Sequence, residues 1–167
     1  MAELLEVKNL SVSFFTPAGE VQAVRNVSFS LRPGEVLAVV GESGCGKSVL
    51  CKSIMKLLPR TARIKSGSIL VNGADITGYR ERDMHKLRGK LFSMVFQDPM
   101  TALNPTIPAG RQIAEAVCVH RHRMPKAEVR RPVDALLELV GLEPEKARLY
   151  PHQLSGGMRR RCFMAIA

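Results

Sequence analysis

Residues 41–48 have the composition and spacing of a phosphate-binding loop. Glycines at 41, 44 and 46 let the backbone adopt dihedrals that a side chain would forbid, so that successive N–H groups can point at a β-phosphate. Lys47 can reach the β- and γ-phosphates, and the hydroxyl of Ser48 suits Mg²⁺. The segment therefore predicts binding of a nucleoside triphosphate. The residues expected to line this site are Gly41, Ser43, Gly44, Cys45, Gly46, Lys47, Ser48 and Val49.

A second glycine turn follows Leu154. Ser155, Gly156 and Gly157 stand at the start of a predicted helix that continues into three arginines. A hydroxyl and bare backbone N–H groups at a helix start are suited to receive a γ-phosphate. The sequence thus holds two segments that could bind the same part of a nucleotide.

The composition places the chain among globular proteins. Hydrophobic residues make up 46% of the 167 residues and charged residues 24%, which disfavours a disordered chain. No apolar run in the sequence approaches the roughly 20 residues that span a bilayer. The acidic start lacks the basic and apolar segments of a secretion signal. We therefore expect a cytosolic location.

A formal net charge of +10 would suit nucleic-acid binding, because clustered Lys and Arg displace counterions from phosphates. The basic residues, however, form short groups with almost no aromatic residues between them for base stacking. We therefore expect no nucleic-acid partner. The excess charge is interpreted as a solvated basic surface, which could face anionic lipid headgroups.

The elements that must position the phosphate loop follow from local patterns. Alternating apolar and polar residues over 4–15 and 21–31 predict a β-hairpin with a loop of about five residues. The apolar run at residues 36–40 predicts a strand buried on both faces. A helix is expected over residues 47–58, where Pro59 stops it. Strand, glycine loop and helix in this order form the context that the loop motif requires.

The remainder of the chain divides into a core and an insertion. Short strands are predicted at residues 67–71 and 91–96, and a short helix at 81–88. Helical spacing of apolar residues then predicts helices over 109–120 and 126–140, the second ended by Gly141. We therefore predict a nucleotide-binding α/β core at residues 1–97, continued by residues 159–167. A helical subdomain is predicted at residues 98–158.

Over essentially its whole length the chain resembles the ATP-binding subunits of ABC transporters. The matching residues are the loop at 41–48, Phe96-Gln97-Asp98, the turn at 154–158, and the helical insertion between the last two. The resemblance implies a P-loop NTPase core with an N-terminal antiparallel β-subdomain and an inserted helical subdomain. It also implies that Gln97 contacts Mg²⁺ and the attacking water, and that Phe14, or its neighbour Phe15, stacks on adenine.

The string at residues 96–105 and the ending of the turn in Met158 resemble one paralogue of the oligopeptide and dipeptide importers. This implies a motor subunit that couples ATP binding and hydrolysis to import of peptides or similar small solutes. The implied partners are a second, different ATP-binding subunit, two membrane permease subunits and, indirectly, an extracytoplasmic solute-binding protein. In such a head-to-tail dimer, Ser155, Gly156 and Gly157 face the partner's ATP. The implied location is peripheral, on the cytoplasmic face of the inner membrane.

In that family an apolar strand ending in an Asp for Mg²⁺, a Glu that polarises water and a switch histidine would follow Ala167. Without these groups we expect severely reduced hydrolysis, because phosphoryl transfer relies on positioning and electrostatic stabilisation. We also expect residues 36–40 to present an exposed apolar edge and face, with poor stability or solubility. A truncated or degenerate nucleotide-binding protein without hydrolysis stays an alternative. A soluble ABC ATPase acting on nucleic acid is less favoured.

Overall fold

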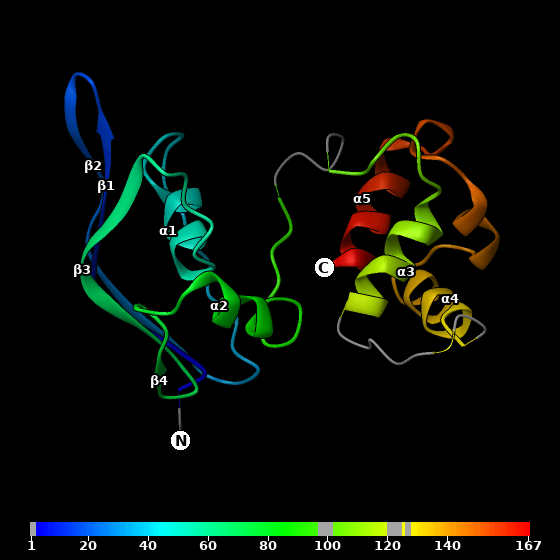
Figure 1. Cartoon of the computed structure of the whole chain (residues 1–167), viewed down its shortest axis with the longest axis horizontal. Coiled ribbons are helices and arrows are strands. Elements are labelled where there is room, and N and C mark those ends of the chain that lie inside the picture. The colour runs from blue at the N-terminus through cyan, green and yellow to red at the C-terminus, as the bar shows by residue number, and fades with distance from the viewer. Residues whose placement is uncertain (1–2, 97–101, 120–124, 126–127) are drawn as a thin grey trace. The chain divides into compact units, whose positions relative to one another are not determined.

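The structure is a computed structural model that describes residues 3–96, 102–119, 125 and 128–167. The chain divides into two compact units, Met1–Lys86 and Leu87–Ala167, each of which is described by itself (Figure 1). The predicted boundary after residue 97 falls at residues that are not described. In the structure, residues 159–167 pack within the second unit, and their assignment to the nucleotide-binding core stays a prediction.

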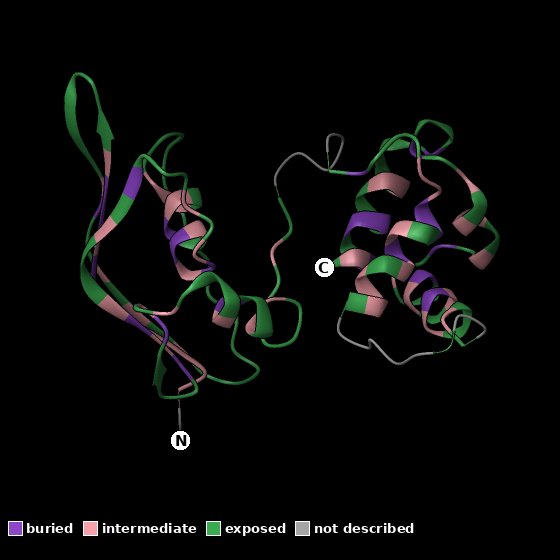
Figure 2. Cartoon of the chain, viewed as in Figure 1, coloured by how far each residue is buried: buried purple, intermediate pink, exposed green. Residues whose placement is uncertain are grey.

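A four-stranded antiparallel sheet forms the framework of the first unit. Its strands β1 (Leu5–Thr16), β2 (Gly19–Leu31), β3 (Ala62–Val71) and β4 (Ala74–Asp75) lie in the order β2-β1-β3-β4. The predicted hairpin is confirmed, with a tighter turn than expected because Thr16 pairs directly with Gly19. Val7, Leu10 and Val12 of β1 are fully buried. Figure 2 shows buried stretches alternating with exposed ones along the strands of this sheet.

Two asparagines bend the hairpin. Asn9 and Asn26 have φ values of 48° and 50°, in a region that asparagine tolerates better than most residues. Each backbone N–H donates to a serine hydroxyl on the opposite strand, Asn9 to Ser28 at 2.7 Å and Asn26 to Ser11 at 3.0 Å. The β1–β2 register shifts at both places. Both are β-bulges, which bend a strand and re-aim its side chains.

Helix α1 (Lys47–Ile54) ends before the predicted limit at residue 58. The reason is Lys56, whose φ of 52° turns the chain out of the helix ahead of Pro59. The Lys56 amine then donates to the backbone oxygens of Thr77 at 2.7 Å and Tyr79 at 2.6 Å. These bonds hold the segment that leads into helix α2 (Glu81–Leu87). The helix confirms the short helix expected at 81–88.

Two of the predicted strands do not occur in the structure. Residues 36–40 lie outside the sheet, and residues 91–96 contribute an isolated bridge between Arg88 and Phe92. Val36 and Val40 are 93% and 91% exposed, which agrees with the expected exposure of this segment. A strand needs a neighbour for its hydrogen-bond ladder, and the described residues provide none here. The strand predictions are therefore wrong for this structure, and the poor solubility stays a prediction.

The second unit is helical. It contains α3 (Ala109–Val119), α4 (Arg130–Leu139), the 3-10 helices η1 (Pro144–Arg148) and η2 (Pro151–Gln153), and α5 (Gly156–Ile166). The helix expected over 126–140 begins at Arg130. Gly141, with φ 71°, ends α4 as predicted, and the N–H of Leu142 donates to the Leu137 oxygen at 2.8 Å.

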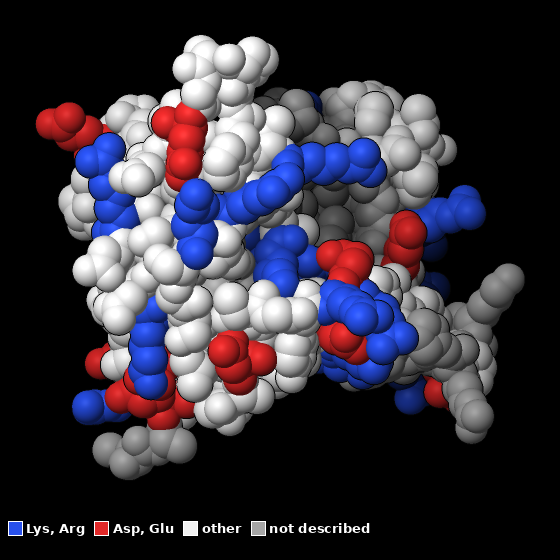
Figure 3. Space-filling model, turned by 60° about the vertical axis from the view of Figure 1, so that its left-hand side comes forward, with Lys and Arg blue, Asp and Glu red and all other residues white. Residues whose placement is uncertain are grey.

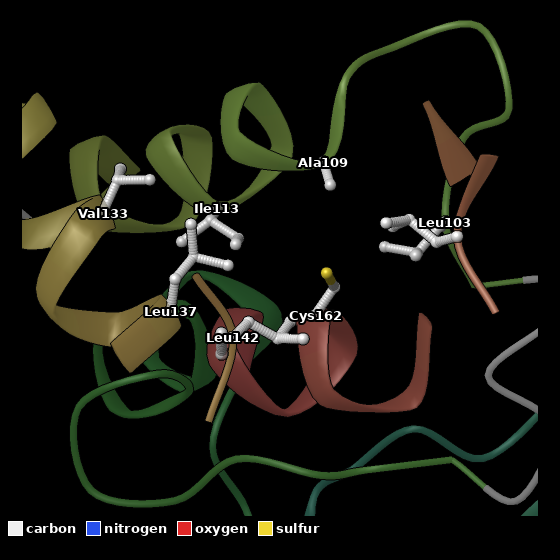
Figure 4. Packing of buried hydrophobic residues seen from close by; sticks show 9 residues of the cluster. Leu103, Ala109, Ile113, Val133, Leu137, Leu142 and Cys162 are labelled. Carbon is white, nitrogen blue, oxygen red and sulfur yellow. The ribbon is translucent and has the colours of Figure 1, made fainter. Parts of the chain in front are cut away.

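Three helices and the segment before α3 share one core (Figure 4). Cys162 of α5 is fully buried in it, and burial raises the pKa of its thiol, so the side chain acts as a small neutral apolar group. Gly110 lets α3 approach η1 closely, since a Cβ there would stand 2.6 Å from the Cβ of Ala147. The residues of this core are Leu103, Ala109, Ile113, Val133, Leu137, Leu142, Leu154, Cys162 and Ala165.

On the face that Figure 3 shows, Lys and Arg side chains stand in more than one group, with Asp and Glu side chains among them. Across the described residues, no helix is long and apolar enough to cross a membrane.

Candidate functional site

The loop at residues 41–48 has the backbone expected of a phosphate cradle. Gly44 and Gly46 have φ values of 84° and 96°, which confirms that glycine is needed at both positions. Gly46 is the N-cap of α1 and its carbonyl accepts the first helical bond, from Leu50 at 2.9 Å. The loop therefore delivers its backbone N–H groups to the start of a helix, where an anion is favoured.

Gly41 serves a different purpose from the predicted one. Its φ is not positive, so the dihedral argument is wrong for this residue. A Cβ at Gly41 would instead stand 2.7 Å from the Sγ of Cys45. The loop folds back on itself at that point, and Gly41 faces the end of a flexible side chain rather than backbone.

The side chain of Lys47 bonds to the backbone of its own loop. Its Nζ donates to the backbone oxygens of Gly41 at 2.7 Å and Glu42 at 2.6 Å, and lies 3.4 Å from the Sγ of Cys45. The ammonium is thus held at the centre of the loop by neutral acceptors. A phosphate is a stronger acceptor than a carbonyl, so a bound triphosphate would compete for the same donors.

A cavity of about 680 Å³ lies between the loop and the hairpin. The loop contributes residues 44–47 and α1 contributes Val49 and Leu50, while β2 contributes residues 21–25 and Val27. Its size is suitable for a nucleotide-sized ligand. Strand β2 meets the loop directly, because a Cβ on Gly46 would overlap the carbonyl oxygen of Ala23.

The two neighbouring phenylalanines of β1 point to different places. Phe14 lines the cavity together with the loop residues. Phe15 is 37% exposed and lies under two cations, with the Arg63 guanidinium 5.7 Å and the Lys65 amine 5.3 Å from its ring centre. Of the two alternatives left by the sequence, the structure places Phe14 in the cavity.

The second glycine turn is built differently from the loop. Ser155 is the N-cap of α5 and its Oγ accepts from the N–H of Met158 at 3.3 Å. Gly156 and Gly157 are exposed, and among the described residues nothing lies within 4 Å of where their Cβ atoms would be. The turn therefore offers open backbone to any approaching molecule.

Two side chains that the sequence argument missed hold this turn. The Oε1 of Gln153 accepts from the N–H of Tyr150 at 2.9 Å, and the Nε of Arg159 donates to the Leu154 oxygen at 3.0 Å. The spacing of a polar residue three positions after Tyr150 was an available signal for the first bond. The bond from Arg159 to Leu154 joins the first turn of α5 to the residue before its N-cap, and no local pattern predicts this contact.

Gln97, the predicted Mg²⁺ and water contact, lies outside the described residues. The loop belongs to the first unit and the turn at 155–157 to the second. A sequence profile of the ABC transporter family matches residues 24–167, which include both segments. The chain belongs to the ABC transporter family.

Several members of the ABC transporter family are similar to the whole chain. Dipeptide transport ATP-binding protein DppD of Bacillus subtilis (strain 168) is 51% identical over 100% of the chain and 50% of its own length. Oligopeptide transport ATP-binding protein OppD of the same strain is 50% identical over 100% of the chain and 47% of its length. OppD of Escherichia coli (strain K12) is 45% identical over 98% of the chain. The chain spans about half the length of the curated relatives it matches.

Solved structures establish the fold of this ABC family member. A dimeric ATP-binding cassette in a post-hydrolysis state, bound to ADP and Pi, has a TM-score of 0.82 at 24% identity. A dimeric bacterial ABC transporter cassette has a TM-score of 0.85, also at 24% identity. Each comparison covers 97% of the chain and 68% of the solved structure. The chain thus has the fold of an ABC ATPase cassette, with an antiparallel sheet and a helical unit.

Proposed function

We propose that the chain binds Mg·ATP and belongs to the ATP-binding motor subunit of an ABC importer for peptides or similar small solutes. The observation that carries the proposal is the cavity that the phosphate loop and Phe14 both line. Identities of 45–51% with dipeptide and oligopeptide transport ATP-binding proteins support the substrate class. In this role, ATP binding and hydrolysis by the whole protein drive transport.

Each half of the nucleotide has a matching surface in the cavity. The ring of Phe14 is suited to stack on adenine, since aromatic faces pack against bases at little geometric cost. The loop glycines direct N–H groups to the β-phosphate, with Ser43, Cys45 and Val49 alongside. Lys47 would exchange its bonds to the Gly41 and Glu42 oxygens for phosphate oxygens.

Mg²⁺ would be held from the start of α1. The hydroxyl of Ser48, the second residue of this helix, is exposed next to the loop and offers the hard oxygen ligand that Mg²⁺ prefers. Gln97 is the second proposed ligand, and it would also orient the attacking water. When bound, Mg²⁺ neutralises phosphate charge; the chain's own contribution is to place the phosphates and the hydroxyl together.

The turn at Ser155, Gly156 and Gly157 is proposed to receive the γ-phosphate of a nucleotide held by a second ATP-binding subunit. Two adjacent glycines at a helix start disfavour the helix, yet the described residues of this chain do not require them. Their open N–H groups and the Ser155 hydroxyl suit an anion brought by another chain. We propose a head-to-tail dimer, with a different subunit as partner.

The proposed assembly also contains two membrane permease subunits and, indirectly, an extracytoplasmic solute-binding protein. The chain would lie peripherally on the cytoplasmic face of the membrane, with no nucleic-acid partner. Co-expression of the full-length protein with its genomic neighbours and reconstitution into proteoliposomes tests this role. We expect ATP-dependent uptake of a labelled dipeptide that is lost in Lys47→Ala. Equal uptake by the variant, or transport that needs no ATP, would overturn the motor function.

A further inference from the structure

Arg25 occupies a β-bulge in the strand that forms one wall of the cavity. Between the ladder pairs that end at Val24 and Val27, two residues of β2, Arg25 and Asn26, oppose the single Ser11 of β1. Asn26 is held in the left-handed region at φ 50°, and its N–H donates to the Ser11 hydroxyl at 3.0 Å. The bulge is therefore fixed by a specific bond.

The residues of β2 on both sides of the bulge line the cavity. They are the five successive residues 21–25 and, beyond the bulge, Val27. Bulges near functional sites commonly re-aim a side chain. Here the bond between Asn26 and Ser11 fixes the strand directly beside Arg25, and Arg25 borders the phosphate-loop cavity.

The charge of the cavity wall is positive. Among its described lining residues the charged side chains are Arg25 and Lys47, with no acidic residue. The Lys47 ammonium is already turned onto the carbonyls of its own loop. Arg25 therefore adds a second positive charge from β2, on a residue that is exposed to solvent.

The position of Arg25 along β2 indicates which part of a nucleotide it would meet. Val21 pairs with Phe14, at the end of the cavity suited to the base. Ala23 lies against Gly46 of the loop. Arg25 lies further along β2 in the same direction, two residues beyond Ala23. It is thus at the phosphate end of the cavity.

We propose that Arg25 binds a phosphate oxygen of the nucleotide, and that the bond between Asn26 and Ser11 aims its guanidinium at that phosphate. This inference rests on the proposed nucleotide binding. A guanidinium is well suited to the task, because its planar donors match the geometry of phosphate oxygens. The charge-assisted bond would add to affinity independently of Lys47.

Calorimetric titration of the full-length protein with Mg·ATP, and separately with adenosine, tests the proposal. We expect Arg25→Ala to weaken Mg·ATP binding about tenfold, the usual effect of losing one charge-assisted hydrogen bond, and to leave adenosine binding unchanged. Arg25→Gln checks that the loss follows charge rather than side-chain volume, and should behave like Arg25→Ala. The matched control is Arg63→Ala, an arginine of the same sheet that lies over Phe15 and should bind Mg·ATP like the wild type.

Ser11→Ala separates aiming from general stability. Loss of the hydroxyl frees the bulge, so Mg·ATP binding should weaken several-fold, and the double variant with Arg25→Ala should be no weaker than Arg25→Ala alone. Additive losses would overturn the aiming role. Unchanged Mg·ATP affinity in Arg25→Ala, or an equal loss for adenosine, would overturn the phosphate contact. A wild-type protein that binds no Mg·ATP would overturn the proposed function as well, which distinguishes the two failures.

Discussion

The two glycine-rich segments of this chain need glycine for opposite reasons. Gly46 in the phosphate loop has a φ of 96°, and any side chain there would overlap the Ala23 carbonyl of the hairpin. Gly156 and Gly157 in the second unit have neither a positive φ nor, among the described residues, a neighbour within 4 Å of their missing side chains. The first segment is constrained by its own fold, and the second by nothing that the structure describes.

This difference teaches how to distinguish a self-contained site from half of a shared one. A loop that binds a ligand within one chain must be shaped by that chain, and its glycines carry the constraint. A turn that meets a ligand held by another chain must keep its backbone bare, and its glycines lower helix stability without an internal gain. The exposed pair at 156–157 fits the second description.

Of the three glycine and arginine variants considered, Gly46→Ala should lower the free energy of unfolding most. The added methyl forces an unfavourable φ and a clash with Ala23, so we expect a loss of unfolding free energy on the order of 2–4 kcal/mol together with loss of Mg·ATP binding. Chemical denaturation with titration of the folded fraction measures both. Near-wild-type stability would show that the loop is not constrained from inside.

Arg159→Ala should lower the free energy of unfolding by an intermediate amount. The variant removes the bond from Nε to the Leu154 oxygen, which holds the entry to the second turn, and we expect a cost of about 1 kcal/mol. Mg·ATP affinity of the isolated subunit should not change, because the loop is in the other unit. Arg160→Ala, at the exposed next position, is the control and should leave stability unaltered. A drop in Mg·ATP affinity would contradict the separation of the two glycine-rich segments.

Gly157→Ala should have the smallest effect on the fold, and in the opposite direction. Alanine favours helix over glycine, so unfolding free energy should rise by up to about 0.5–1 kcal/mol. The same change should abolish ATP-dependent dimerisation, measured by light scattering, because the methyl occupies the bare surface. A Gly157→Ala variant that is less stable but still dimerises would show that Gly157, like Gly46, is required by the fold of its own chain.

The parts of the fold that the sequence predicted are those that local chemistry determines. The hairpin follows from alternation, the start of α1 from the glycine spacing, and the start of α5 from Ser155 as an N-cap. The strands at residues 36–40 and 91–96 were predicted wrongly because pairing depends on distant partners. The early end of α1 depends on Lys56, whose amine donates hydrogen bonds to the backbone oxygens of Thr77 and Tyr79, more than 20 residues further along the chain.

The candidate site could be predicted only in part for the same reason. The loop residues and Phe14 are readable from the sequence. Phe14, residues 44–47 and Val49 line one cavity, whereas Gly41, Ser43 and Ser48 are not among its lining residues. Arg25 was missed because a position in an alternating strand does not show which cavity it borders, and the structure places it beside the loop cavity, next to the bulge opposite Ser11. An asparagine within an alternating strand was the available signal.

The most direct test of the central claim is isothermal titration of the full-length protein with Mg·ATP, alongside Lys47→Ala. The account predicts saturable binding by the wild type, competed by ADP, and loss of binding in the variant while its thermal unfolding stays cooperative. A wild type that registers no heat, or a variant that binds equally well, would contradict nucleotide binding at residues 41–48.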